Sequence, residues 1–254
     1  MTALELMAAR SRYNYVPGRL IASTGPETDL SCWGLRVVHE MPSHVEWNTM
    51  AGRSRYASVE LDRYHTELLN REPLGDILLG LLSVVFWGYV SGTDGLFYPN
   101  RAISKAKMLS RGRGRIAPQR SAEIFECFQD ARQHLIVDDI EGALQKAMSI
   151  KFLGMSFASK VLMFMNPSAA VVYDSIIARY LSNSPDSRLR QMAISTEAST
   201  NRERQASAYS RWCSFCVKTA SSMNDAGHLW TDWNGTKHSW RAVDVERGFF
   251  AAAG

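Results

Sequence analysis

Residues 138–181 read DDIEGALQKAMSIKFLGMSFASKVLMFMNPSAAVVYDSIIARYL. Apolar residues recur at helical spacing on both sides of a short turn at residues 152–155, which is typical of helices that bury one face. After the second of these helices an apolar run leads to Asp174, where a third helical pattern begins. This stretch therefore predicts two helices joined by a hairpin turn and followed by one carboxylate at a fixed position.

Two aspartates of this stretch are predicted to cap helices. Asp138 precedes a helix predicted over residues 139–148, and a short acceptor side chain at that position can bond the first free amides of a helix. Asp174 has the same relation to the helix that follows it. A simple helix cap is therefore the alternative to any chemical role for Asp174.

Helical patterns extend over most of the remaining chain, so the fold is predicted to be mainly α. Helices are expected over residues 57–69, 74–90, 119–135, 202–223 and 240–250, with a polar loop over 183–201 and a short apolar stretch at 35–38 that suits a strand. The helix over 74–90 is apolar nearly all round, which predicts that it lies in the protein interior.

Positive charge is concentrated in one segment. Between Gly95 and Ala122 there is no acidic residue, and there are seven basic ones: Arg101, Lys105, Lys107, Arg111, Arg113, Arg115 and Arg120. The glycine-rich piece Arg111–Arg115 is predicted to be a flexible loop. A local basic loop is what contact with a phosphate backbone uses, and an ordinary solvated loop is the alternative.

Composition narrows the class of protein. The chain has 254 residues, a formal net charge of +4 and 46% hydrophobic residues, which suits a globular protein of one or two domains. Its N-terminus lacks the pattern of a signal peptide, and its most apolar run, residues 77–90, is shorter than the roughly 20 residues of a membrane span. Four scattered cysteines favour a reducing cytoplasm. Neither a metal nor a cofactor is expected, because Cys213 and Cys216 have no histidines at zinc-finger spacing.

The hairpin, residues 150–162, resembles the motif of the helix-hairpin-helix DNA glycosylase superfamily. The family pattern is a hydrophobic residue, glycine, a second hydrophobic residue and a second glycine, followed later by an alanine and a pair of hydrophobic residues. The matching positions are Leu153, Gly154, Ala158, Val161 and Leu162. Phe152 stands where the family has its first glycine. The resemblance covers roughly residues 119–181 and is greatest to the 8-oxoguanine glycosylase-like branch.

The resemblance implies that this turn grips DNA. The free amides of a helix start, aided by the helix dipole, suit a phosphate oxygen. The residues expected at this contact are Lys151, Phe152, Gly154, Met155 and Ser156. Arg111, Arg113 and Arg115 are expected to add further phosphate contacts.

The resemblance also implies a catalytic role for Asp174. In the superfamily a catalytic aspartate follows the alanine at a set spacing and opens a helix, and Asp174 stands 16 residues after Ala158. Breaking an N-glycosidic bond builds positive charge on the sugar, which a fixed carboxylate can stabilise. The same carboxylate can orient or deprotonate the attacking water.

Lys160 is the second expected catalytic residue. Relatives that also cut the DNA strand use a hairpin lysine as a nucleophile, and Ser156 stands at that position here, which predicts a monofunctional glycosylase. Lys160 lies one helical turn further along the same face. It is expected to contact the base, to bind a phosphate or to be the nucleophile after all, and a solvated lysine is the alternative.

The pocket for the extruded base is expected to include Trp87, Trp240 and Asp244. In glycosylases of this type the last helix returns to the active site, which places Trp240 and Asp244 near the base. Core packing is the alternative for both tryptophans. Some relatives hold an iron–sulfur cluster on four C-terminal cysteines, and since only Cys213 and Cys216 are present in this region, no cluster is expected.

The predicted architecture is a mainly α monomer with two helical subdomains around a cleft and a helix-hairpin-helix motif. The expected segments are an N-terminal segment of uncertain structure (1–56), a helical subdomain with the basic loop (57–135), the hairpin with the aspartate (136–182) and C-terminal helices that pack back on the core (183–254).

The expected partner is DNA, and the expected activity is removal of a modified or damaged base in repair, or in defence against phage DNA. A non-catalytic DNA-binding protein, a glycosylase/lyase that uses Lys160, and a helical bundle without a nucleic-acid role are the alternatives.

Overall fold

The computed structural model describes residues 1–13, 19–24, 34–38, 58–90, 98–232 and 234–253. Helices dominate this part of the chain, which confirms the predicted helical class, and the sheets in it are two short strand pairs. Most of the N-terminal segment predicted over 1–56 lies outside the described residues. The chain divides into two units: the α3 unit, residues 14–127 and 150–152, and the α12 unit, residues 1–13, 128–149 and 153–254.

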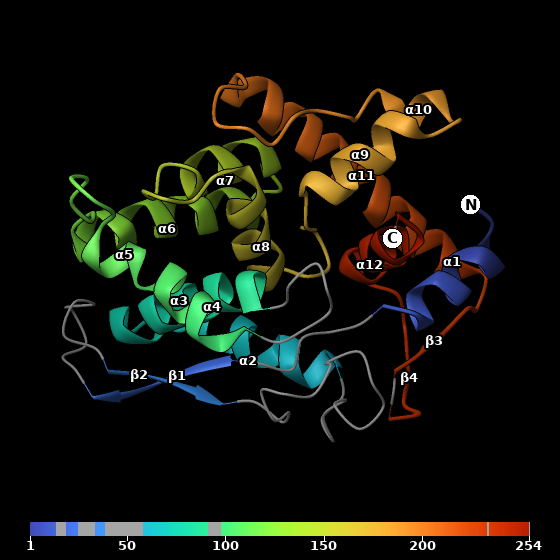
Figure 1. Cartoon of the computed structure of the whole chain (residues 1–254). Coiled ribbons are helices and arrows are strands. Elements are labelled where there is room, and N and C mark those ends of the chain that lie inside the picture. Colours follow the sequence, from blue (N-terminus) through green and yellow to red (C-terminus); the bar gives the residue numbers. More distant parts are fainter. Residues whose placement is uncertain (14–18, 25–33, 39–57, 91–97, 233, 254) are drawn as a thin grey trace. The chain divides into compact units, whose positions relative to one another are not determined.

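The α3 unit is built around one buried helix. Its elements are β1 (Arg19–Thr24), β2 (Gly34–Val38), α2 (Ser58–Asn70), α3 (Leu74–Val90), α4 (Pro99–Ala106) and α5 (Met108–Arg111). Strands β1 and β2 pair antiparallel, with Arg19 opposite Val38. Helices α2 and α4 and strand β1 contact α3 (Figure 1), which is buried along most of its length. The interior helix predicted over 74–90 is therefore confirmed.

Helix α6 (Ser121–Ile136) starts in the α3 unit and ends in the α12 unit. The other elements of the α12 unit are α1 (Ala3–Ser11), α7 (Ile140–Ala147), α8 (Met155–Met165), α9 (Ser175–Asn183), α10 (Ser187–Arg190), α11 (Arg202–Asp225), β3 (Trp230–Thr231), β4 (Lys237–His238) and α12 (Ala242–Ala253). Helix α11 contacts α7 and α12, and α12 also contacts α1 and α9 (Figure 1). Trp212 of α11 meets Phe249 of α12 edge-on, with ring centroids 5.4 Å apart.

Residues 170–173 form a buried segment that belongs to no helix or strand. Two side chains of α11 donate hydrogen bonds to carbonyls of this segment. The hydroxyl of Tyr209 donates to the Val171 carbonyl at 2.9 Å, and the indole N–H of Trp212 donates to the Val172 carbonyl at 3.2 Å. Because an unpaired buried carbonyl costs free energy, these bonds fix the path of the segment.

The end of the same segment is tied to α8. The amide of Tyr173 donates to Oγ of Ser159 at 2.9 Å, and the Ser159 hydroxyl lies 3.0 Å from the Ser156 carbonyl, to which it donates. Both Ser159 and Tyr173 are fully buried. The position of the next residue, Asp174, therefore follows from the position of α8.

Two predicted details of secondary structure are wrong. The cap of α7 is Asp139, whose carboxylate accepts the Gly142 amide at 2.9 Å. Asp138 cannot cap the helix, because its backbone is left-handed, with a φ of 59°. The polar stretch 183–201, predicted as a loop, contains the short helix α10, which Asp186 caps.

In the described part of the chain, none of the helices combines the length and the apolar character that crossing a bilayer requires.

Replacing Ser159 with alanine tests the tie between α8 and the buried segment. The variant leaves the buried Tyr173 amide without its acceptor, so the free energy of unfolding should fall by about 1–3 kcal/mol. Urea denaturation followed by circular dichroism measures the loss. Ser182→Ala is the control, because the exposed Ser182 hydroxyl only bonds back to the Ala178 carbonyl of its own helix. Equal effects of the two substitutions would contradict the proposed tie.

Candidate functional site

Lys160 and Asp174 lie together in the α12 unit. Lys160 belongs to α8, and Asp174 is the N-cap of α9. Nζ of Lys160 is 3.4 Å from Oδ2 of Asp174, and the two side chains are 9% and 17% exposed. Oδ1 of Asp174 accepts the amides of Ile176 and Ile177 at 3.1 and 3.2 Å. One carboxylate oxygen thus caps the helix, while the other faces the lysine.

The remaining contacts of Lys160 hold its side chain along α8. Its Nζ lies 3.5 Å from the Ser156 carbonyl, to which it donates, and 5.4 Å from the centre of the Phe157 ring. Lys160 as a whole is buried, at 8% exposure. The alternative of a solvated lysine on a helix surface is therefore wrong.

Glu246 of α12 is a third ionisable residue that interacts electrostatically with this pair, and no sequence pattern singled it out. It is buried, and its charge interacts with those of Asp174 and Lys160. Burial and the neighbouring Asp174 carboxylate raise the pKa of Glu246 to about 8. The sequence does contain a signal: Glu246 lies inside the apolar helix AVDVERGFFAAA, where a buried charge costs free energy unless it is paired.

Asp244, which was predicted to line the base pocket, instead bonds arginine side chains in the protein interior. It is fully buried, and Arg10 and Arg241 bond its carboxylate at 3.1 and 2.8 Å, while Nη1 of Arg247 lies 3.8 Å away. Burial acts to raise the pKa of Asp244, but the charges of Arg241 and Arg10 outweigh it and hold that pKa below its ordinary value. In this arrangement Asp244 joins α1 to α12, and its carboxylate is engaged within the protein.

The two tryptophans predicted for the base pocket lie in separate units. Trp240 is buried in the α12 unit, where its backbone N–H donates to the Asn224 side chain at 2.8 Å. Trp87 is buried on α3 in the other unit. Core packing, the alternative given for both residues, matches their burial.

In the turn between α7 and α8, the left-handed backbone conformation lies at a phenylalanine and not at the glycine. Phe152, at the position of the family's first glycine, adopts a left-handed backbone with a φ of 69°. Gly154 has a φ of −83° and caps α8 without a side chain. A Cβ on Gly154 would meet no atom within 4 Å. The strained conformation that normally favours glycine thus falls on Phe152, and the glycine at 154 leaves open space at a helix start.

Lys151 connects this turn to the basic segment within the α3 unit. Its amide donates to the side-chain oxygen of Gln119 at 2.9 Å, and its ammonium donates to the Ala117 carbonyl at 3.4 Å. Lys151 is exposed. Of the other residues expected at this contact, Gly154 is exposed and Met155 is buried.

The predicted loop Arg111–Arg115 is the end of α5 followed by a tight turn. Arg113 and Ile116 exchange both backbone hydrogen bonds, at 2.9 and 3.0 Å. Gly112 has a φ of 76°, and a Cβ there would collide with the Ile116 carbonyl oxygen, so the turn requires glycine. The three arginines Arg111, Arg113 and Arg115 are all exposed.

Cys213 and Cys216 are buried in α11, and burial raises the pKa of the Cys213 thiol to about 12. Among the described residues no group of three or more His, Cys, Asp and Glu side chains is arranged to hold a metal ion.

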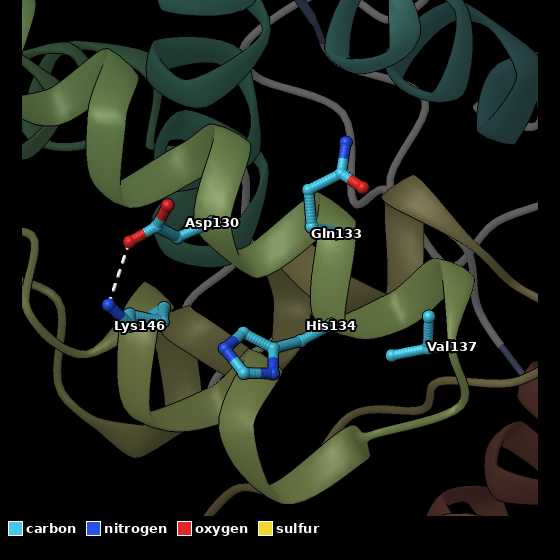
Figure 2. A pocket seen from close by; sticks show the side chains of 5 residues that line it. All are labelled: Asp130, Gln133, His134, Val137 and Lys146. Atoms are coloured by element: carbon cyan, nitrogen blue, oxygen red, sulfur yellow. Dashed lines mark hydrogen bonds and ion pairs between the residues drawn. The ribbon is translucent and has the colours of Figure 1, made fainter.

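A hollow of about 380 Å³ lies on α6 and α7. Figure 2 shows the side chains that line it: Asp130, Gln133, His134, Val137 and Lys146. The charges of Lys146 and Asp130 pair at 2.7 Å across one side of it. These two groups satisfy each other, and no predicted site residue lines the hollow.

The chain was compared with protein-family models, with curated proteins and with solved structures, and none of these comparisons gave a match. The arrangement of Lys160 and Asp174 is therefore the starting point for a functional assignment.

Proposed function

We propose that this chain is a DNA glycosylase that hydrolyses the N-glycosidic bond of a modified or damaged base flipped out of DNA. The observation that carries the proposal is the position of Asp174. Its carboxylate remains partly exposed beside the buried Lys160, although the segment that leads to it is fully buried. Capping of α9 accounts for the hydrogen bond that Oδ1 of Asp174 accepts, but it does not account for the position of Lys160 beside Oδ2.

The chemistry follows from the charge of this carboxylate. As the bond between sugar and base breaks, the sugar acquires oxocarbenium character, and a preorganised negative charge lowers the energy of that state. The amides of Ile176 and Ile177 hold Asp174 in one rotamer, so its orientation costs little at the moment of reaction. The same carboxylate can orient the water that replaces the base.

The α7–α8 turn is the proposed grip on the DNA strand and, in this proposal, the hairpin of a helix-hairpin-helix motif. Helix α8 starts at an exposed glycine that supplies no side-chain cap, and a helix start of this kind suits an anion. Neither the backbone conformation nor the packing of Gly154 requires a glycine. A glycine at position 154 would allow a phosphate to approach the backbone closely, because no side chain stands in the way.

The exposed arginines Arg111, Arg113 and Arg115 are proposed to contact further phosphates. Their charges attract DNA and release its counterions on binding. We also propose the architecture that this activity would use, which is two helical subdomains around a cleft. Base flipping costs a few kcal/mol, which contacts with the strand and stacking of the extruded base offset.

A second candidate is a glycosylase that also cuts the strand. The observation that favours it is the 3.4 Å separation of Lys160 and Asp174, because the carboxylate can take a proton from the ammonium, and the freed amine can then bond the sugar carbon while the bond from that carbon to the base breaks. Borohydride reduction of a reaction with DNA distinguishes the two. Hydrolysis by water should leave no covalent adduct, whereas an adduct that disappears in Lys160→Met and persists in Lys218→Met would establish the second candidate.

Asp174→Asn should abolish base release without unfolding the protein. Asparagine caps helices nearly as well as aspartate, so the unfolding temperature should change little, whereas loss of the charge should slow release at least about a hundredfold. The measurement is mass spectrometry of bases freed from DNAs that carry different lesions and phage-type modifications. Asp186→Asn, at the cap of α10, is the matched control. If wild type releases bases and Asp174→Asn is equally active, the assigned role of Asp174 is wrong.

Gly154→Asp should weaken DNA binding while leaving the fold intact. An aspartate at this position can cap α8, which adds a few tenths of a kcal/mol to its stability. Its charge would repel a phosphate at the helix start, so the Kd for duplex DNA should rise about tenfold. Fluorescence anisotropy at two salt concentrations measures the Kd. The control is Asn201→Asp, which places the same charge at the cap of α11. Equal losses of affinity in both variants would argue against a phosphate at Gly154.

A further inference from the structure

Gln119 joins two parts of the α3 unit that are distant in the sequence. Its side-chain oxygen accepts the backbone N–H of Lys151 at 2.9 Å, and Lys151 belongs to the turn between α7 and α8. Its side-chain nitrogen donates to Sγ of Cys127 on α6 at 3.9 Å. Both ends of the Gln119 amide group are therefore bonded within the protein, and the side chain is held between α6 and the turn.

The arginine turn (residues 111–116) packs against the same stretch of chain. A Cβ on Gly112 would collide with the Ile116 carbonyl oxygen and would lie 3.1 Å from the carbonyl carbon of Ala117, so the turn lies directly on this backbone. The Lys151 ammonium donates to the Ala117 carbonyl at 3.4 Å. The arginine turn and Lys151 therefore contact the same peptide group.

This arrangement gathers positive charge in one part of the α3 unit. Lys151 and the three arginines of the arginine turn are exposed. An ammonium has three donors, and the contact with one carbonyl leaves Lys151 with donors for an anion. Glu123 is an acid whose charge interacts with that of Lys151, but its carboxylate is paired with Arg120 at 2.6 Å. A phosphate therefore meets net positive charge at this surface.

The bond from Gln119 also acts beside a strained residue. Phe152, which follows Lys151, has a φ of 69°, and a residue other than glycine keeps such a conformation only where its surroundings hold it. The hydrogen bond to the Lys151 amide is one such restraint. Loss of this bond should therefore free Lys151 to leave the arginine turn.

We propose that Gln119 is a positioning residue that holds Lys151 on the arginine turn, so that this lysine and the arginines bind the phosphates of DNA as one unit. The role rests on the proposed function, because DNA is the ligand that it names. The tie between Gln119 and Lys151 can be measured without DNA. A preorganised group of charges loses less conformational freedom on binding than separate flexible side chains do, so the tie increases affinity.

Hydrogen exchange of the Lys151 amide tests the tie in the protein alone. In protein made with isotope-labelled lysine, NMR follows this amide, which is identified by its loss in Lys151→Met. Gln119→Met removes the acceptor, so the amide should exchange about fivefold faster, as expected for the loss of one hydrogen bond. Gln119→Glu keeps an oxygen at the end of the side chain and should exchange as wild type does.

Gln145→Met is the matched control, because Gln145 is exposed on α7. Circular dichroism verifies that each variant is folded. Equal exchange of the Lys151 amide in wild type and in Gln119→Met overturns the tie.

The salt dependence of DNA binding tests the positioning role. Fluorescence anisotropy gives the Kd for duplex DNA at several salt concentrations, and each neutralised phosphate contributes about 0.9 to the slope of log affinity against log salt. Lys151→Met removes one charge and should reduce the slope by about this amount. Gln119→Met removes no charge, yet it should reduce the slope by a similar amount, because Lys151 is no longer held in place. Gln145→Met and Lys218→Met should leave the slope unchanged.

The double variant decides whether Gln119 acts through Lys151. Once the tie is lost, adding Lys151→Met to Gln119→Met should change the slope little, whereas independent roles would give the sum of the two reductions. An unchanged slope in Gln119→Met, or additive reductions in the double variant, overturns the proposal and leaves the proposed function in place. If the wild-type chain does not bind DNA, the proposed function fails together with this role, and hydrogen exchange still decides whether Gln119 holds Lys151.

Discussion

Residues 170–173 lie in the interior of the α12 unit outside any helix or strand, and the rest of the site depends on which groups bond their backbone. A sheet would supply backbone hydrogen bonds, but this segment belongs to no sheet. Side chains of Ser159, Tyr209 and Trp212 supply them instead. Because each of these residues is itself anchored in a helix, the segment is held as firmly as the helices are. Asp174 emerges at its end with little freedom to move.

The helices of this protein were largely predictable from the sequence, because their apolar faces repeat at helical spacing. The limits of α3 agree with the predicted interior helix, and Asp174 caps α9 as the pattern of a short acceptor before a helix indicates. Neighbouring acids are harder to tell apart: Asp138 and Asp139 have the same chemistry, and in the structure Asp139 accepts the Gly142 amide while Asp138 has a left-handed backbone.

The site was predictable only where its members are close in sequence. Lys160 and Asp174 follow from the hairpin, but Glu246 comes from the last helix, and no spacing rule relates it to them. Asp244 shows the same limit. An acid two residues from Glu246 suggests a shared role, yet three arginines surround Asp244 and lower its pKa, whereas burial beside Asp174 raises that of Glu246. Environment, and not residue type, separates the two.

The ion pair between Arg10 and Asp244 joins residues that are 234 positions apart. Arg10 also stacks over Trp230, with its guanidinium carbon 3.8 Å from the ring centre, and both Trp230 and Asp244 lie late in the chain. During synthesis, which adds about 5–20 residues each second, α1 leaves the ribosome long before these partners exist. Helix α1 can therefore dock on α12 only after some 230 further residues have been added.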